Sequence, residues 1–386
     1  MNDVPTMFAV LTPPGAAAVA TIAVAGPRAW DILRQSFRPA SHRPLPVQPD
    51  YHGFTYGQFG DPPGDAVVMA ARPATVGDCV ELHCHGGPEV VSMLAAELTR
   101  QGAALTTASH LLPRLGVSPL AAKAQMELAL APTLRTAAIL LDQFAGALAQ
   151  AVAGIEVAVA DSDLGSAARL VDNLTAHSAL GRHLTRPWRV AVAGAPNVGK
   201  SSLVNALAGY QRSVVTEIPG TTRDVVVTSL AIDGWPVELI DTAGQRSASD
   251  PLEGQGIERG RVAAAAADLC LWVVDASAEP IWPDAGPGPS LLVINKSDLP
   301  ARWDVGNVGE CNVVSARTGV GLGDLCDRIS RRLVPHPPAP GAAVPFTPEL
   351  ADKVDAIAKA VDGGDIATIR QTLAALASSA QSALPG

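Results

Sequence analysis

The sequence predicts an α/β protein built around a mostly parallel sheet with helices on both faces. Three observations support this prediction. Residues 188–333 alternate strand-like apolar runs with helical segments, the pattern of parallel strands joined by helices. Residues 117–186 are largely apolar, contain few glycines and lack strand-like alternation, so we expect helices there. Residues 1–116 mix strand and helix signals, which indicates a separate α+β segment.

The N-terminal segment has a recognisable order of elements. A strand is expected at Thr21–Ala25, after a turn formed by Thr-Pro-Pro-Gly at residues 12–15. A second strand is expected at Asp78–His83. A helix over Glu89–Gln101 should follow, because Pro88 suits the first turn of a helix. This segment is therefore predicted to be an α+β domain.

Composition defines the remaining boundaries. Residues 117–186 form a helical segment, and residues 187–334 form the sheet domain. Residues 335–386 begin with a proline-rich stretch that predicts a stiff linker. Thr347 can cap a helix that has Pro348 at its first position, and two adjacent glycines then break the C-terminal helical region into two short helices.

Composition also excludes several classes of protein. The 386 residues allow two or three domains, and 48% of them are apolar, so a sizeable core can form. A net charge of −9 does not fit a protein that coats nucleic acid by bulk electrostatics, although it leaves room for a local basic patch. The five cysteines are scattered without a CxxC pair, which argues against a disulfide framework. No apolar run reaches the length of a membrane span, so we expect a cytoplasmic protein without a membrane partner.

A phosphate-binding loop opens the sheet domain. An apolar strand at residues 189–193 runs into Gly194-Ala-Pro-Asn-Val-Gly-Lys-Ser201, the GxxxxGK[ST] pattern with a strand before it and a helix after it. The glycines let backbone N–H groups turn toward phosphate oxygens, and the helix adds its positive end. We expect Lys200 to bridge the β- and γ-phosphates of a nucleoside triphosphate and Ser201 to ligate Mg²⁺.

Two later segments complete the predicted phosphate and magnesium site. A strand ends in Asp241-Thr-Ala-Gly244, where Asp241 can hold Mg²⁺ through water and the Gly244 N–H can meet the γ-phosphate. Between this motif and the phosphate loop lie Thr221 and Thr222. A threonine there can complete the Mg²⁺ shell while the γ-phosphate is present and is released on hydrolysis, as in GTPase switches.

Two further strand ends identify the base as guanine. One strand leads into Asn295-Lys-Ser-Asp298, whose Asp298 carboxylate can accept hydrogen bonds from guanine N1–H and the 2-amino group. Adenine lacks both donors, and an unpaired buried acceptor costs on the order of a few kcal/mol. Another strand leads into Ser315-Ala-Arg317, whose backbone N–H groups can approach guanine O6. The predicted ligands are therefore GTP or GDP with Mg²⁺.

These motifs give a full set of predicted site residues. The nucleotide-binding residues are Gly194, Asn197, Val198, Gly199, Lys200, Ser201, Ser202, Thr216, Ile218, Thr221, Thr222, Asp241, Gly244, Asn295, Lys296, Asp298, Ser315, Ala316 and Arg317. The predicted Mg²⁺-associated residues among them are Ser201, Thr222 and Asp241.

The sequence resembles one family of GTPases. Gly220-Thr-Thr-Arg-Asp224, with Asn197 in the phosphate loop, is similar to motifs of the TrmE–Era–Der group. Thr12-Pro-Pro-Gly15 and Glu81-Leu-His-Cys-His-Gly-Gly-Pro88 narrow the resemblance to the MnmE (TrmE) family of tRNA modification GTPases, of which the chain resembles a divergent member. The resemblance implies a P-loop GTPase domain inserted between two parts of a helical domain, and an N-terminal domain that binds folate and forms a homodimer. It also implies tRNA and an MnmG-like flavoprotein as partners in modifying wobble uridine.

The resemblance also implies roles for individual residues. In the family, GTPase domains pair across K⁺, bound at positions that match Asn197, Thr216, Ile218 and Thr221. The family's catalytic Glu matches Glu253, which would orient the attacking water beside Lys200. Gln245 directly follows the DTAG motif, where Ras-like GTPases place their water-orienting Gln. Both Glu253 and Gln245 are therefore candidates for that role.

Several positions depart from the family pattern. The family's folate-binding Arg falls at Ala23, and its folate-binding Lys falls at Leu120, one helical turn from Lys123. The C-terminus also lacks the family's CxGKC-type motif. An anionic folate tail needs cationic partners, so these departures argue against one-carbon chemistry. Two hypotheses remain: a GTPase of tRNA modification, and a divergent paralogue that acts as a nucleotide-dependent assembly or binding switch without folate chemistry.

Overall fold

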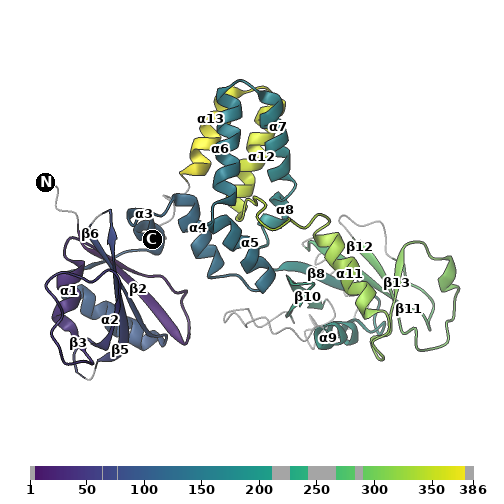
Figure 1. The fold of residues 1–386 in the computed structure, drawn as a ribbon. Coiled ribbons are helices and arrows are strands. Elements are labelled where there is room, and N and C mark those ends of the chain that lie inside the picture. The colour runs from purple at the N-terminus through teal and green to yellow at the C-terminus, as the bar shows by residue number, and fades with distance from the viewer. Residues whose placement is uncertain are drawn as a thin grey trace, which may run out of the picture. The chain divides into compact units, whose positions relative to one another are not determined.

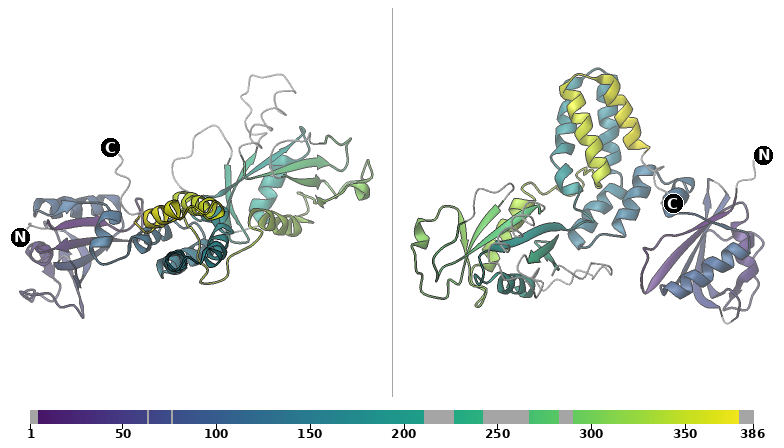
Figure 2. Two further views of the ribbon diagram at one scale, coloured as in Figure 1. Left: turned by 90° about the horizontal axis from the view of Figure 1, so that it is seen from above. Right: turned by 180° about the vertical axis from the view of Figure 1, so that it is seen from behind.

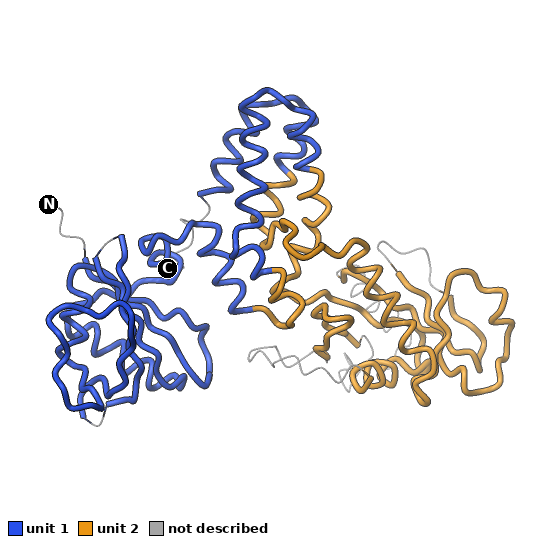
Figure 3. The backbone as a smooth tube through the Cα atoms, in the orientation of Figure 1, with its two compact units in different colours: residues 1–130, 140–171, 356–386 blue, residues 131–139, 172–355 orange. Residues whose placement is uncertain are grey.

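The computed structural model describes residues 5–62, 64–75, 77–210, 227–241, 267–282 and 290–378. The chain forms two compact units, which Figure 3 colours separately. The first unit contains residues 1–130, 140–171 and 356–386, and the second contains residues 131–139 and 172–355.

The first unit begins with a mixed sheet, which has seven strands among the described residues, in the order β3-β4-β5-β6-β2-β1-β7 (Figure 1). All neighbouring strands in it are antiparallel except β1 and β7. The strands are β1 (Met7–Val10), β2 (Val19–Gly26), β3 (Phe37–Pro39), β4 (Phe54–Phe59), β5 (Asp65–Ala74), β6 (Gly77–His85) and β7 (Ala104–Leu105).

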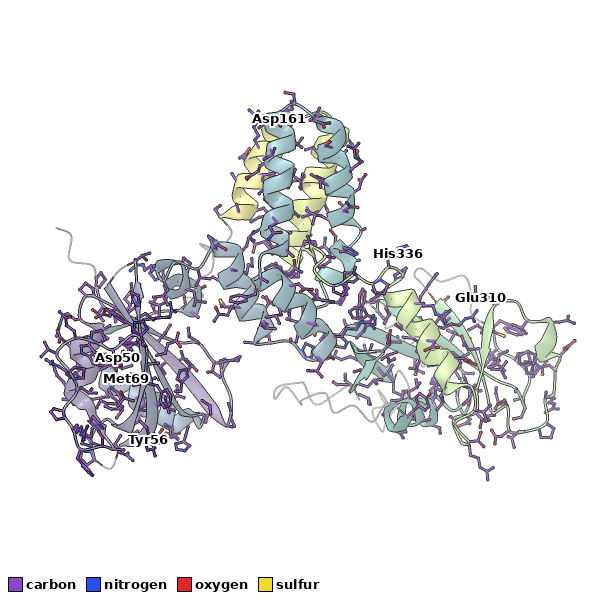
Figure 4. The ribbon with its side chains drawn as sticks, in the orientation of Figure 1. Asp50, Tyr56, Met69, Asp161, Glu310 and His336 are labelled. Carbon is purple, nitrogen blue, oxygen red and sulfur yellow. The ribbon has the colours of Figure 1, made fainter. Side chains whose placement is uncertain are left out.

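Alternation along these strands builds two cores, because successive side chains point to opposite faces of a sheet. Phe8 and Ile22 belong to one core, which helices α1 and α2 complete. Ala23 belongs to the opposite core, which α3 and α4 complete. Met69 is buried in the first core, whereas Tyr56 on the next strand is exposed (Figure 4). The helices are α1 (Ala29–Ser36), α2 (Pro88–Arg100), α3 (Ala108–Arg114) and α4 (Pro119–Leu128).

The predicted N-terminal elements are confirmed with small shifts in their ends. The expected strands at 21–25 and 78–83 lie within β2 and β6, and the expected helix at 89–101 is α2. Pro88 is the first residue of α2, as its fixed φ angle favours.

Helices follow the N-terminal sheet, as the sequence predicts for residues 117–186. Helix α13, from the C-terminal part of the described chain, packs beside α6 in the first unit although about two hundred residues separate them in sequence (Figure 2). Among the described helices no single one is long and apolar enough to cross a membrane, and α5 with α6 reaches that length only as a pair bent by 46°. The helices are α5 (Leu134–Phe144), α6 (Ala147–Ala160), α7 (Leu164–Thr175), α8 (Ser178–Gly181), α12 (Pro348–Asp362) and α13 (Ile366–Ala377).

The second unit contains a sheet with the strand order β13-β12-β11-β8-β10-β9, six strands within the ranges that the structure describes. All neighbours are parallel except β9 and β10, which form an antiparallel hairpin. The predicted, mostly parallel sheet is therefore confirmed. Its elements are β8 (Trp188–Gly194), α9 (Lys200–Tyr210), β9 (Val227–Ile232), β10 (Trp235–Asp241), β11 (Leu269–Asp275), β12 (Ser290–Asn295), the 3₁₀ helix η1 (Val305–Asn307), β13 (Cys311–Val313) and α11 (Leu322–Leu333).

Parallel pairing brings the predicted motifs together. Strands β8, β10 and β12 end at Gly194, Asp241 and Asn295, at the same edge of the sheet. Ligands of open α/β sheets bind at this carboxyl edge, because the loops that leave it can converge. Motifs about a hundred residues apart in sequence therefore share one site.

The proline-rich stretch before α12 packs against the protein and is not an exposed linker. It contains neither helix nor strand, but Val344 and Phe346 within it are fully buried. A Cβ at Gly181 would lie only 2.1 Å from the Pro345 carbonyl oxygen, so the stretch packs closely against α8. The predicted cap is confirmed, because the Leu350 N–H donates to Thr347 Oγ1 at 3.2 Å. The stretch is thus held in place by packing as well as by proline stiffness.

A short helical segment belongs to the second unit although it precedes α6 in sequence. Thr133 Oγ1 donates to the Gly234 carbonyl at 2.6 Å, and Arg135 Nη1 lies 2.7 Å from the Asp233 carboxylate. The Arg135 guanidinium also lies 4.1 Å from the centre of the Trp235 ring. These contacts hold the β9–β10 turn, which explains why residues 131–139 group with the sheet.

Candidate nucleotide-binding site

The loop between β8 and α9 has a backbone shape that requires glycine at two positions. Gly194 has φ +141°, and a Cβ there would lie 2.3 Å from the Val273 carbonyl oxygen of the neighbouring strand. Gly199 has φ +94°, and a Cβ there would lie 2.5 Å from Asn295 Nδ2. Both the backbone angle and the space therefore exclude a side chain. The loop can approach the neighbouring strand ends only because these two residues are glycines.

Lys200 begins α9 and directs its ammonium group back over the loop. Its Nζ donates to the carbonyl oxygens of Gly194 at 2.9 Å and Ala195 at 2.7 Å, and the residue is buried. A buried ammonium is stable only when its hydrogens are paired. This position supplies a fixed positive charge beside the backbone N–H groups of the loop, which suits a polyphosphate.

Ser201 and Asp241 meet at the start of α9. Ser201 Oγ donates to Asp241 Oδ2 at 2.5 Å, and Asp241 is buried at the end of β10. Because the serine hydrogen is directed to the carboxylate, the serine oxygen keeps lone pairs for a cation. Hard oxygen donors of this kind are the ligands that Mg²⁺ uses in nucleotide sites. The residues present therefore fit Mg²⁺, which would neutralise phosphate charge when bound.

The Asn295 side chain bridges two loops. Its Nδ2 donates to the Val198 carbonyl at 3.0 Å, and its Oδ1 accepts from the Ala316 N–H at 3.0 Å. The side chain is fully buried, so both contacts are shielded from water. Asn295 thereby fixes the separation between the phosphate loop and the loop after β13.

Asp298 is held by the side chain of Ser315. From the sequence alone, Ser315 is predicted to contribute only a backbone N–H. Ser315 Oγ donates to Asp298 Oδ1 at 2.6 Å, while Arg317 Nη1 lies 3.9 Å from Oδ2. The Ser315 hydrogen bond lowers the pKa of Asp298 below its usual value, and the charges of Arg317 and Lys296 lower it further. The group is therefore an ionised, acceptor-only carboxylate at neutral pH, as recognition of the guanine N1–H edge requires.

Asp275 contacts a predicted site residue, Lys296, but belongs to none of the sequence motifs. It ends β11, next to β12, and its Oδ2 accepts from Lys296 Nζ at 2.5 Å. Burial raises its pKa, but the hydrogen bonds from Lys296 and Ser277 outweigh burial and leave the pKa below the usual value. The available signal was a strand ending in Asp beside the strand that ends in Asn-Lys.

The structure brings the described site residues to one sheet edge. The predicted residues outside the described ranges are Thr216, Ile218, Thr221, Thr222, Gly244, Gln245 and Glu253. Ser202 lies exposed in the first turn of α9.

Comparison with known protein families gives two matches. Residues 189–296 match the model of the 50S ribosome-binding GTPase family. Residues 6–109 match the model described as the N-terminus of the GTP-binding protein TrmE.

Full-length relatives cover most of the chain. The tRNA modification GTPase MnmE of Heliobacterium modesticaldum is 33% identical, over 84% of this chain and 80% of the relative. The MnmE protein of Chloroflexus aurantiacus is 35% identical, over 86% of this chain and 82% of the relative. Among solved structures, the G domain of the T. maritima iron transporter FeoB is 25% identical, covers 38% of this chain and 99% of its own, and has a TM-score of 0.27.

Proposed function

This chain belongs to the family of the tRNA modification GTPase MnmE, and from that premise we propose that its GTP hydrolysis serves the modification of wobble uridine in tRNA. The observation that carries the proposal is the match to MnmE proteins along more than four fifths of the chain, including both the N-terminal sheet and the GTPase domain. The nucleotide site supports the first half of the function, because its phosphate and base-binding groups share one sheet edge.

Genetic complementation tests this proposal. The full chain is expressed in a bacterium that lacks its own MnmE protein, and the nucleosides of purified tRNA are measured by mass spectrometry. We expect the modified wobble uridine to return, and the Lys200→Ala variant should not restore it. GTP hydrolysis in the purified protein without any return of the modification would contradict the proposal.

A second candidate function is a GTP-dependent assembly or binding switch without folate chemistry, and two buried residues favour it. Leu120 and Ala23, at the positions of the family's folate-binding Lys and Arg, are 5% and 0% exposed. Ala23 also belongs to an apolar core. Neither can meet a folate carboxylate. Calorimetric titration with a formyl-tetrahydrofolate analogue separates the two candidate functions. Tight binding would favour tRNA modification, and no binding would favour the switch without folate chemistry.

We further propose that the family's partners and monovalent cation apply here: a homodimer, an MnmG-like flavoprotein, and K⁺ held by Asn197 with Thr216, Ile218 and Thr221. Support comes from Asn197, which has a left-handed backbone with φ +64° inside the phosphate loop. The other three residues lie outside the described ranges. Glu253 and Gln245 both stay candidates for orienting water.

K⁺ should accelerate GTP hydrolysis by at least about tenfold over Na⁺, because a fixed cation near the β- and γ-phosphates offsets charge that develops during hydrolysis. Phosphate release is measured at matched ionic strength in the two salts. The Asn197→Ala variant should lose most of the difference. Equal rates for the unaltered protein in both salts would contradict K⁺ assistance.

A further inference from the structure

The Asp275 carboxylate has hydrogen-bond donors at both of its oxygens, and one donor is Lys296. Lys296 belongs to residues 295–298, which we call the base-recognition loop. Asp275 Oδ1 accepts from the Ser277 N–H at 2.8 Å and from Ser277 Oγ at 2.7 Å. Its Oδ2 accepts from Lys296 Nζ at 2.5 Å, and the Asp275 side chain is only 9% exposed. Each oxygen therefore has its own donor, and the carboxylate has little freedom to turn.

The main chain of Asp275 is fixed as well. Its carbonyl oxygen accepts from Trp303 Nε1 at 3.0 Å, and the next residue, Ala276, donates its N–H to the Asn295 carbonyl at 2.9 Å. Asp275 and Asn295 are direct partners in the parallel register of β11 and β12. The carboxylate is thus a rigid part of the sheet edge from which the Asn-Lys loop leaves.

Lys296 links the Asp275 carboxylate to the phosphate loop by hydrogen bonds. The same Nζ that donates to Asp275 also donates to the Asn197 carbonyl at 2.8 Å. Lys296 and Asn197 both have left-handed backbones, with φ +63° and φ +64°. Residues other than glycine rarely adopt this conformation unless their surroundings enforce it, and such residues cluster at ligand sites. One hydrogen bond therefore joins two residues with left-handed backbones, one in the phosphate loop and one in the base-recognition loop.

We propose that Asp275 is a positioning residue for nucleotide binding: its carboxylate aims the Lys296 ammonium at Asn197 and so keeps the phosphate loop and the base-recognition loop in their binding arrangement. The proposal rests on the GTP site described above and adds to it a residue outside the recognised motifs. The ion pair by itself adds little to stability, because the Lys296 side chain is 31% exposed and an ion pair open to solvent is weak.

The test is a titration of the full chain carrying Asp275→Asn with GDP and with a non-hydrolysed GTP analogue. The amide has the same shape but no charge, so it holds the ammonium less firmly. We expect the Kd for both nucleotides to rise about tenfold, while kcat at saturating GTP changes less than about twofold. Glu310→Gln is the matched control, because Glu310 pairs with Arg328 on the exposed surface, and it should leave both Kd values unchanged.

A double-mutant cycle identifies the route of the effect. If Asp275 acts through Lys296, then adding Asp275→Asn to Lys296→Met should raise the Kd little further. Additive losses, or an unchanged Kd in Asp275→Asn, would overturn the inference. A lowered melting temperature with an unchanged Kd would also overturn it, since that result assigns Asp275 to stability alone. If the unaltered protein bound neither nucleotide, the GTP site itself would be refuted first.

Discussion

Asp298→Asn should weaken binding of guanosine di- and triphosphates by about two to three orders of magnitude and strengthen binding of the xanthosine nucleotides. In the predicted base recognition the carboxylate would accept two hydrogen bonds from the guanine edge, and hydrogen bonds to charged groups are stronger than those between neutral groups. An asparagine offers one acceptor and one donor. Its amide N–H cannot pair with the guanine 2-amino group but can donate to the oxygen that xanthine carries instead.

Calorimetric titration with guanosine and xanthosine diphosphates measures this exchange. The Ser315 hydrogen bond should survive, because the asparagine carbonyl oxygen still accepts, so the loop should keep its shape. Asp304→Asn is the control, since Asp304 caps η1 and lies outside the predicted base-binding motifs, so the same change there should leave both affinities unaltered. Guanine affinity that stayed unchanged in Asp298→Asn, or xanthine affinity that did not rise, would refute the base assignment.

The lowered pKa of Asp298 predicts how this carboxylate contributes to the pH dependence of nucleotide binding. A depressed pKa means that the carboxylate is ionised throughout the neutral range and is protonated only as the pH falls through the lowered value. GDP affinity should therefore be flat between about pH 6 and 8, well above the ordinary pKa of an aspartic acid.

The sequence alone could predict those parts of the site whose residues are adjacent along the chain. The phosphate loop is one run from Gly194 to Ser201. Its two glycines are required because a side chain at either position would collide with an adjacent strand end. The strands around it are short buried apolar runs, and their length indicates strands and not helices. Asp298 was predictable for the same reason, because its motif directly follows such a strand.

The parts that could not be predicted depend on which strands are neighbours. Asp275 becomes a site residue only because β11 lies beside β12 in register, and that order is set by crossover connections, not by local sequence. The contact of Arg135 with the β9–β10 turn likewise joins segments about a hundred residues apart. The pairing of Ser315 with Asp298 needed the position of a side chain that motif reasoning assigned only a backbone role.

Asn295→Ala should cause the second large loss of nucleotide affinity, because alanine can make neither of the two buried hydrogen bonds of the Asn295 side chain. The Val198 carbonyl and the Ala316 N–H would each lose a partner in a place shielded from water. Leaving two such groups unpaired costs about 2 to 4 kcal/mol together. Because those groups belong to the phosphate loop and to the loop after β13, nucleotide binding would have to restore the alignment of the two loops. Nucleotide affinity should therefore fall, by an upper bound of roughly 1,000-fold that is reached when the ligand supplies the whole cost.

Two further variants separate the bridge from a general loss of packing. Asn312→Ala removes another buried asparagine of the same sheet, one that accepts from Arg328 at 3.2 Å, and it should change nucleotide affinity little. Asn295→Asp keeps the acceptor for the Ala316 N–H but faces the Val198 carbonyl with a second oxygen, so it should also bind nucleotide weakly. Equal losses in Asn295→Ala and Asn312→Ala, measured by titration with GDP, would show that packing and not the bridge controls binding. A normal affinity in Asn295→Asp would show that the donor to Val198 is dispensable, and the two loops would then have to be aligned by Lys296 and Asp275 alone.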